Sequence, residues 1–260
     1  MTTLSGEQLT VGYDERIVIQ DMNIVFPANK ITAIIGPNGC SKSTLLKTMA
    51  RLHKAKSGVT YLDGKNIHKI ATKEIAKKMA ILPQAPEAPN GLTVYDLVSY
   101  GRTPHQSGFT RLSKQDREKI DWALDVTGLN ELRDQEVDTL SGGQRQRAWI
   151  AMSIAQETSL LLLDEPTTYL DLAHQLEVLQ LLKKLNEEEN RTIIMVIHDL
   201  NQAARFAHHL VAMKKGQVFK EGSAEEVITE DVLQQVFNID TSIVVDPRTG
   251  KPAVISYDLL

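Results

Sequence analysis

Residues 31–44 read Ile31-Thr32-Ala33-Ile34-Ile35-Gly36-Pro37-Asn38-Gly39-Cys40-Ser41-Lys42-Ser43-Thr44. The apolar first part predicts a buried β-strand, and the segment from Ser43 to Leu52 is typical of a helix. A strand, a glycine-bearing loop and a helix in this order form a phosphate-binding loop, because main-chain N–H groups at a helix N-terminus attract anions. Lys42 can reach the β- and γ-phosphates of a nucleoside triphosphate, and the Ser43 hydroxyl can ligate Mg²⁺.

One residue departs from the usual phosphate-loop pattern, which has glycine directly before the lysine where this chain has Ser41. Glycine can be needed there for a positive φ or for close approach of the main chain to phosphate, and the sequence leaves both explanations open. A positive φ would cost serine roughly 1–3 kcal/mol. In that case we expect replacement of Ser41 by glycine to tighten nucleotide binding.

The composition is typical of a soluble globular α/β protein, with 260 residues, 42% hydrophobic, 24% charged and a formal net charge of -4. No apolar run approaches the ~20 residues of a membrane span, and the first residues lack the basic segment of a signal peptide. The single cysteine, Cys40, excludes an internal disulfide and fits a reducing compartment. The mild acidity argues against a nucleic-acid partner.

Two further apolar runs, residues 160–163 and 193–197, are typical of buried strands in a parallel sheet. The first is followed by Asp164 and Glu165, and the second by His198. Open α/β sheets bind ligands at the carboxyl ends of their strands. We therefore expect Asp164 to hold Mg²⁺, Glu165 to polarise an attacking water as a general base, and His198 to hydrogen-bond a γ-phosphate.

A second candidate anion site lies at Leu140-Ser141-Gly142-Gly143-Gln144, which precedes a helix-forming segment. Ser141 and the two glycines would stand at the N-terminus of that helix, where anions bind. A single nucleotide does not need two such sites from one subunit. We therefore expect a homodimer, in which each nucleotide lies between the first site of one copy and the second site of the other.

The rest of the chain indicates an α/β core with two additions. Residues 1–30 predict antiparallel β structure before the core. Capping boxes that begin at Thr93 and Ser113 predict helices, and we expect a helical subdomain of about residues 93–155 inserted in the core. Residues 241–260 predict a short β tail with a central turn. The whole chain is then a single domain.

Together these motifs resemble those of the ATP-binding subunits of ABC transporters, over nearly the whole length of the chain. Residues 36–44 are similar to the Walker A motif, residues 160–165 to the Walker B motif and residues 140–144 to the family signature. Gln84, in Leu82-Pro83-Gln84, resembles the Q-loop glutamine, and His198 resembles the switch histidine.

The resemblance implies a P-loop NTPase fold, ATP hydrolysis, and ATP with Mg²⁺ as ligands. Tyr13 matches the aromatic residue that stacks on adenine, and Asp171 ends a segment similar to the D-loop. The implied catalytic residues are Glu165, His198 and Gln84, and the implied metal ligands are Ser43, Gln84 and Asp164. The implied nucleotide-binding residues are Tyr13, Gly36, Pro37, Asn38, Gly39, Cys40, Ser41, Lys42, Ser43, Thr44, Ser141, Gly142, Gly143, Gln144 and Asp171.

Two segments point to a subfamily, Gly101-Arg102-Thr103-Pro104-His105 and Asp164–Asp171 followed by His174-Gln175. They resemble the ATPases that import ferric siderophores, haem and vitamin B12. The resemblance implies a peripheral protein on the cytoplasmic face of the cell membrane, bound to integral permease subunits and indirectly to a substrate-binding protein. We expect an iron-siderophore as cargo, with haem or vitamin B12 as alternatives, and a permease helix near residues 84–105.

Other ATPases of the same superfamily have different sequence organisations. An exporter ATPase is usually fused to membrane spans, and a ribosome-acting factor carries two such domains in one chain. A DNA-repair ATPase separates its motifs by a long coiled coil, whereas the gap between Gln84 and Ser141 holds only a small helical segment. A nucleotide-binding scaffold without hydrolysis is a further alternative, because Ser41 could weaken the phosphate site.

Overall fold

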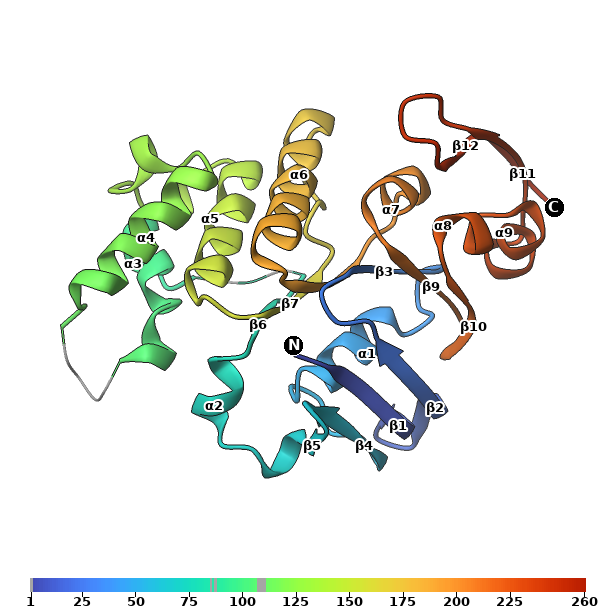
Figure 1. The fold of residues 1–260 in the computed structure, drawn as a ribbon, viewed down its shortest axis with the longest axis horizontal. Coiled ribbons are helices and arrows are strands. Elements are labelled where there is room, and N and C mark those ends of the chain that lie inside the picture. Colours follow the sequence, from blue (N-terminus) through green and yellow to red (C-terminus); the bar gives the residue numbers. More distant parts are fainter. Residues whose placement is uncertain (1, 85, 87, 107–110) are drawn as a thin grey trace. The chain divides into compact units, whose positions relative to one another are not determined.

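A computed structural model describes residues 2–84, 86, 88–106 and 111–260 of the chain. The chain forms two compact units (Figure 1). The first unit consists of Met1–Ile70 and Thr192–Leu260, and the second unit consists of Ala71–Arg191. No helix among the described residues combines the length and the apolarity that a membrane crossing needs.

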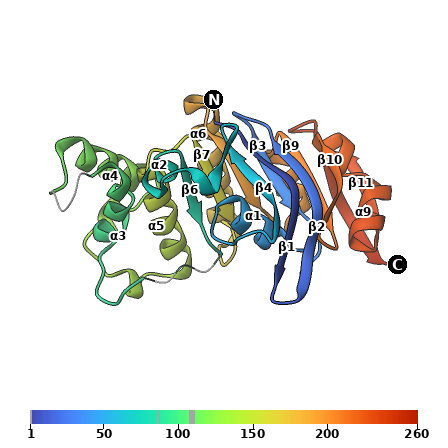
Figure 2. The same cartoon turned by 90° about the horizontal axis from the view of Figure 1, so that it is seen from below.

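The first unit is built mainly of strands, which form an antiparallel sheet in the order β2-β1-β4-β5, a run of strands β10-β9-β3-β8, and a hairpin of β11 and β12. In Figure 2, β1, β2 and β4 run side by side. The strands are β1 (Leu4–Tyr13), β2 (Arg16–Phe26), β3 (Ile31–Ile35), β4 (Ser57–Leu62), β5 (Lys65–Asn66), β8 (Thr192–Val196), β9 (His209–Lys214), β10 (Gln217–Gly222), β11 (Ile239–Val245) and β12 (Pro252–Leu259). The helices are α1 (Lys42–Met49), α7 (Leu200–Phe206), α8 (Ala224–Val227) and α9 (Glu230–Phe237).

Parallel pairing organises the centre of this unit. Strand β3 pairs in parallel with β8 on one side and with β9 on the other. All side chains of β3 and β8 are buried, as the continuous apolar runs of the sequence predict. The predicted antiparallel β part is also present, and its first two strands are long and extend to Phe26.

The second unit is mainly helical. Helices α3, α4 and α5 pack on one another, and appear in green to yellow-green in Figure 1. Strands β6 and β7 pair in parallel, and Leu82 lies opposite Leu163. The elements are α2 (Thr72–Ala76), β6 (Met79–Leu82), α3 (Val94–Tyr100), α4 (Lys114–Val126), α5 (Gly142–Ala155), β7 (Leu160–Asp164) and α6 (Leu172–Glu189). Short 3₁₀ turns lie at Ile67–Lys69 in the first unit and at Thr103–His105, Asn130–Leu132 and Val137–Thr139 in the second.

Local signals of the sequence explain where several helices begin and end. The predicted capping boxes at Thr93 and Ser113 are both formed, and they start α3 and α4. The prediction of a helix from Ser43 to Leu52 is wrong in its bounds. Helix α1 ends at Met49, because the chain reverses at Arg51, whose φ of 61° is left-handed.

A buried ion pair joins three parts of the second unit. The side chain of Arg102 is only 2% exposed, and its Nε lies 2.9 Å from Oδ1 of Asp116 at the start of α4. Its Nη1 donates to the carbonyl of Ala155 at the end of α5, at 2.7 Å. Burial alone would raise the pKa of Asp116, but hydrogen bonds from Ser113 and Arg102 outweigh it and hold that pKa below its usual value.

Replacing Arg102 by methionine should destabilise the protein strongly. The change leaves the carboxylate of Asp116 buried without its cation, which we expect to lower the free energy of unfolding by about 3–5 kcal/mol. Urea unfolding at neutral pH measures this quantity. Because the folded-state pKa of Asp116 is lowered, the stabilisation that it contributes is present at neutral pH and is lost as pH falls through that pKa.

The matched control is Lys114→Ala, which breaks an exposed ion pair with Glu118 one turn away on α4. Its effect should stay within about 0.5 kcal/mol. Equal losses in the two variants would contradict a structural role for the Arg102 pair.

Candidate nucleotide-binding site

The phosphate loop connects β3 to α1, and Lys42 is held inside it. The side chain of Lys42 is buried, and its Nζ donates to the carbonyls of Gly36 and Pro37 at 2.8 and 3.0 Å. The main chain therefore wraps around the ammonium group. Phosphate oxygens are the acceptors that could replace these carbonyls.

Two glycines of the loop are needed for different reasons. At Gly36 a Cβ atom would lie 2.3 Å from the carbonyl oxygen of Met213, so only glycine allows this approach of β9. Gly39 has a φ of 76°, and a Cβ there would meet nothing within 4 Å. Gly39 therefore serves the backbone conformation alone.

Ser41 has a φ of 80° and a ψ of 22°, which is the left-handed region. Of the two explanations that the sequence leaves open, the backbone angle is thus a real constraint at this position. The Ser41 hydroxyl donates a hydrogen bond of 3.1 Å to the carbonyl of Val18, and it does not cap α1. This bond offsets part of the strain, and Val18 lies on a strand that sequence reasoning did not connect to the loop.

Cys40 lies in the same loop and is buried. Burial raises the pKa of its thiol, and the nearby ammonium of Lys42 opposes this only in part. The sulfur lies 3.9 Å from Nζ of Lys42. A neutral thiol at this point leaves Lys42 as the charge that faces an incoming anion.

Tyr13 lies beside the end of the phosphate loop. Its ring is about half exposed, and its hydroxyl lies 3.3 Å from Oγ1 of Thr44. The other neighbour is His53, whose ring centroid lies 4.6 Å from that of Tyr13 and whose Nε2 lies 3.1 Å from the carbonyl of Gly12. His53 was missed by the sequence analysis, because no local pattern connects it to Tyr13.

His198 follows the carboxyl end of β8, the parallel neighbour of β3. The main chain beside it is fixed by a hydrogen bond of 3.2 Å from the N–H of Ile197 to the carbonyl of Ile34. His198 and the phosphate loop therefore leave the sheet at the same edge. Asp199 caps α7 by accepting from the N–H of Gln202 at 2.9 Å.

The second unit repeats this arrangement with other residues. Strands β6 and β7 are parallel neighbours, so Gln84 after β6 and Asp164 at the end of β7 lie at one edge. Glu165 comes next, with a φ of 56°, and is buried. Oε2 of Glu165 accepts a hydrogen bond of 3.0 Å from the hydroxyl of Thr168, which orients the carboxylate.

The signature segment begins α5, as predicted. Ser141 and Gln144 form a capping box, in which the N–H of Gln144 donates to Oγ of Ser141 at 3.3 Å and the N–H of Ser141 donates to Oε1 of Gln144 at 3.0 Å. The first helical residues are Gly142 and Gly143. Their N–H groups lie in the first turn, where a helix has no carbonyl partner of its own.

Asp171 caps the neighbouring helix α6. Its Oδ1 accepts from the N–H of His174 at 2.9 Å and lies 2.8 Å from Nδ1 of the same residue. The hydrogen bonds from the His174 main chain and side chain lower the pKa of Asp171. The side chain is exposed, so it stays available to a partner.

The predicted site residues thus fall into two groups. The phosphate loop and His198 lie in the first unit, where the pairing of β3 with β8 places them at one edge, and Tyr13 lies in the same unit at the end of β1, beside Thr44. Gln84, the pair after β7, the signature segment and Asp171 lie in the second unit.

Residues 19–168 match the model of a known family, described as ABC transporter. The chain belongs to the ABC transporter family. The predicted family and the predicted P-loop fold, with its antiparallel β part, parallel strands and helical part, are therefore confirmed.

The chain is similar along its full length to ATP-binding subunits of ABC importers. It is 64% identical to the iron(3+)-hydroxamate import ATP-binding protein FhuC of Bacillus subtilis (strain 168), covering 100% of this chain and 97% of the relative. It is 48% identical to the ferric enterobactin transport ATP-binding protein FepC of Escherichia coli, covering 97% of this chain and 93% of the relative.

Solved ABC structures have the same fold. An ABC transporter of metal-chelate type in an inward-facing conformation matches with a TM-score of 0.82 at 31% identity, over 98% of this chain and 96% of that one. The dimeric ATP-binding cassette MJ0796, in a post-hydrolysis state with ADP and Pi, matches with a TM-score of 0.75 at 28% identity, over 85% of this chain and 98% of that one.

The two roles of Ser41 can be separated by two substitutions. Ser41→Ala loses the hydrogen bond to Val18 but keeps a Cβ atom at positive φ, so we expect it to lower the free energy of unfolding by about 0.5–1.5 kcal/mol. Ser41→Gly loses the same bond but relieves roughly 1–3 kcal/mol of strain, so it should be more stable than Ser41→Ala by about that amount. Urea unfolding compares them, and a glycine variant less stable than the alanine variant would contradict the strain. That glycine also tightens nucleotide binding stays a prediction.

Proposed function

We propose that this chain is the ATP-hydrolysing subunit of an ABC importer that takes up an iron-siderophore. The observation that carries the proposal is the 64% identity, over the whole chain, to a protein whose name states iron(3+)-hydroxamate import. The ferric enterobactin relative adds a second siderophore, which favours this cargo over haem or vitamin B12.

ATP binds through the phosphate loop and Tyr13. The Nζ of Lys42 exchanges the carbonyls of Gly36 and Pro37 for oxygens of the β- and γ-phosphates, and the N-terminus of α1 adds main-chain donors. Tyr13 presents an aromatic face for adenine next to Thr44. The rest of residues 36–44 lines the phosphates.

The oxygen-bearing side chains of Ser43, Gln84 and Asp164 suit Mg²⁺, which prefers oxygen ligands. When bound, this ion neutralises charge on the phosphate oxygens. Ser43 lies in the first turn of α1, and Asp164 ends a buried strand next to the one that precedes Gln84. The donor set therefore fits the metal that the family uses.

Glu165 acts as the general base. Its carboxylate takes the proton from a water that attacks the γ-phosphorus, and the hydroxyl of Thr168 keeps the carboxylate oriented. His198 donates a hydrogen bond to the γ-phosphate, and Gln84 orients the water and the metal. The bond to the β-phosphate oxygen breaks as the new bond forms.

Two copies form a homodimer when ATP is bound. The helix N-terminus at Ser141, Gly142 and Gly143 contributes donors to the nucleotide held by the partner copy, and Asp171 faces that copy. The similarity to a dimeric cassette supports this arrangement. Closure is a population shift, because these contacts exist only in the closed dimer.

The dimer docks on integral permease subunits at the cytoplasmic face of the membrane, as a peripheral protein, and it reaches a substrate-binding protein only through them. We place the permease contact near residues 84–105. Gly101 and Arg102 are buried, so Tyr100 and Thr103, which are exposed, carry the contact in this part of the surface. No nucleic acid takes part.

The substitution Glu165→Gln should slow hydrolysis strongly and leave ATP binding intact. Loss of a general base lowers the rate of hydrolysis by a factor of about 10²–10⁴. With MgATP the variant should accumulate as a dimer in size-exclusion chromatography, while the parent stays largely monomeric because it turns the nucleotide over. A variant that remains monomeric and hydrolyses ATP at the parental rate would exclude this role of Glu165. Absence of ATP hydrolysis by the parent itself would favour a scaffold without hydrolysis.

Deletion of the gene should abolish siderophore-dependent growth in iron-poor medium. A plasmid that carries the parental chain should restore uptake of radioactive iron, and Lys42→Ala should not, because its phosphate contact is lost. Lys47→Ala is the matched control, since it removes a lysine from the same helix outside the phosphate loop. Normal iron-siderophore uptake in a deletion strain without a substitute ATPase would exclude an iron-siderophore as the cargo.

A further inference from the structure

Helix α5 is joined to the segment that carries Glu165 by one buried hydrogen bond. The side-chain amide of Gln146 donates to the carbonyl of Pro166 at 3.2 Å, and Gln146 is only 7% exposed. Proline has no N–H, so this carbonyl is the only polar main-chain group that Pro166 offers. The amide thus fixes the main chain one residue after Glu165.

The first turn of α5 also packs against the far end of the same segment. A Cβ atom at Gly143 would lie 3.2 Å from the side chain of Leu170, and one at Gly142 would lie 3.9 Å from the carbonyl of Tyr169. A side chain at Gly143 would press on Leu170, whereas a Cβ at Gly142 would make only an ordinary van der Waals contact. Gly143 therefore allows α5 to lie close to the segment.

The segment between β7 and α6 has a demanding conformation. Glu165 and Tyr169 are both left-handed, with φ of 56° and 66°. Residues other than glycine keep such backbone angles only where the surrounding structure enforces them. Within the segment, the N–H of Thr168 donates to the carbonyl of Glu165 at 3.2 Å, and from outside the amide of Gln146 holds Pro166.

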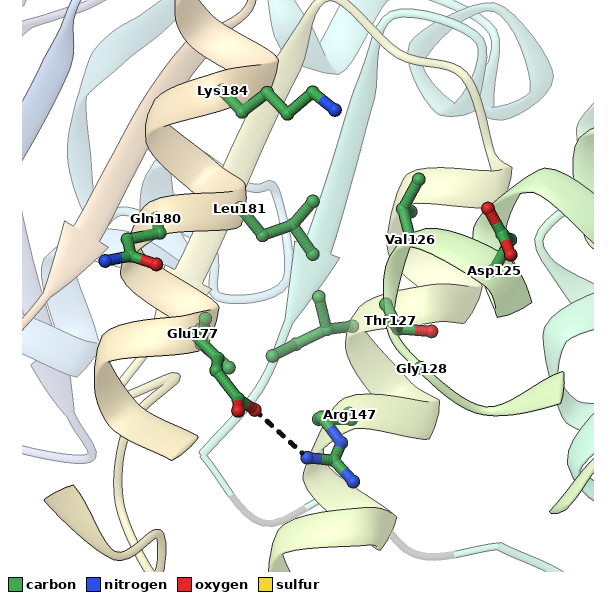
Figure 3. Close-up of a pocket in the computed structure, with 11 residues that line it drawn as sticks. Asp125, Val126, Thr127, Gly128, Arg147, Glu177, Gln180, Leu181 and Lys184 are labelled. Atoms are coloured by element: carbon green, nitrogen blue, oxygen red, sulfur yellow. Dashed lines mark hydrogen bonds and ion pairs between the residues drawn. The ribbon is translucent and has the colours of Figure 1, made fainter. Parts of the chain in front are cut away.

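Farther along, α5 and α6 are separated by a cavity of about 670 Å³ (Figure 3). Ile150 of α5 and Leu181 of α6 line it, and the two helices are bridged there by the ion pair of Arg147 with Glu177, at 3.3 Å. Glu177 is largely exposed, so this pair is weak. The buried bond of Gln146 is the firmer of the two connections.

We propose that Gln146 is a positioning residue for Glu165, and that it connects the two nucleotides of the dimer through one chain. The inference rests on the proposed function, in which the N-terminus of α5 contacts the nucleotide of the partner copy. When that nucleotide engages Ser141, α5 moves as a rigid helix. The amide of Gln146 then carries the displacement to the main chain that sets the carboxylate of Glu165.

The test is steady-state ATP hydrolysis by the full chain with Gln146→Met, which keeps the length of the side chain and removes the donor. We expect kcat to fall about tenfold, with KM within about twofold, because the base is displaced while ATP binding is retained. Gln146→Asn keeps the amide but is too short to reach Pro166, and it should show the same loss.

The matched control is Gln156→Met, at the other end of α5, where the side-chain amide donates to the carbonyls of Ala76 and Met79. Both variants should lower Tm by about 2–4 °C. Only Gln146→Met should lower kcat, whereas Gln156→Met should leave kcat unchanged. A kcat for Gln146→Met equal to that of Gln156→Met would overturn the inference.

A second measurement separates positioning from a general structural effect. Added to Glu165→Gln, Gln146→Met should not lower the residual single-turnover rate further, since its target is already absent. It should also leave the MgATP-dependent dimer of Glu165→Gln intact. A further tenfold loss, or loss of the dimer, would overturn the inference. Hydrolysis by Glu165→Gln at the parental rate would instead overturn the proposed function on which it rests.

Discussion

The parallel pairing of fully buried strands is the constraint on which the rest of the structure depends. Strands β3 and β8 in the first unit, and β6 and β7 in the second, each present their carboxyl ends at a common edge. Most side chains inside these strands are apolar and buried, so the candidate site residues lie at the strand ends and in the segments that follow. The phosphate loop, His198, Gln84 and Glu165 all owe their positions to this single feature of the sheet.

Two of these segments contain a site residue with a positive φ, Ser41 and Glu165, and each segment is held by a different element. Ser41 keeps its positive φ with the help of the carbonyl of Val18 on β2. Glu165 keeps its positive φ next to Pro166, which the amide of Gln146 on α5 holds. The positive φ angles thus lie in the loops, while the hydrogen bonds that hold these loops come from β2 and α5.

The difference between what the sequence predicts and what it misses follows from the range of the interactions. Buried strands and the capping boxes of α3 and α4 depend on residues within a few positions of one another, and these predictions are confirmed. The hydrogen bond of Ser41 to Val18, the tilted ring contact of Tyr13 with His53 and the hydrogen bond of Gln146 to Pro166 join residues about 20 to 40 positions apart. No periodic pattern marks such pairs. The sequence could therefore indicate the site residues but not the long-range contacts that hold them in place.

Gly101 and Arg102, in one of the two segments that resemble the importer subfamily, are both buried. A Cβ atom at Gly101 would lie 2.3 Å from the carbonyl of Met152, and Arg102 binds Asp116 and the end of α5 from a fully buried position. Both residues therefore build the junction of α3, α4 and α5. In the permease contact proposed near residues 84–105, exposed neighbours such as Tyr100 would reach the partner, while the buried Arg102 would fix how they are presented.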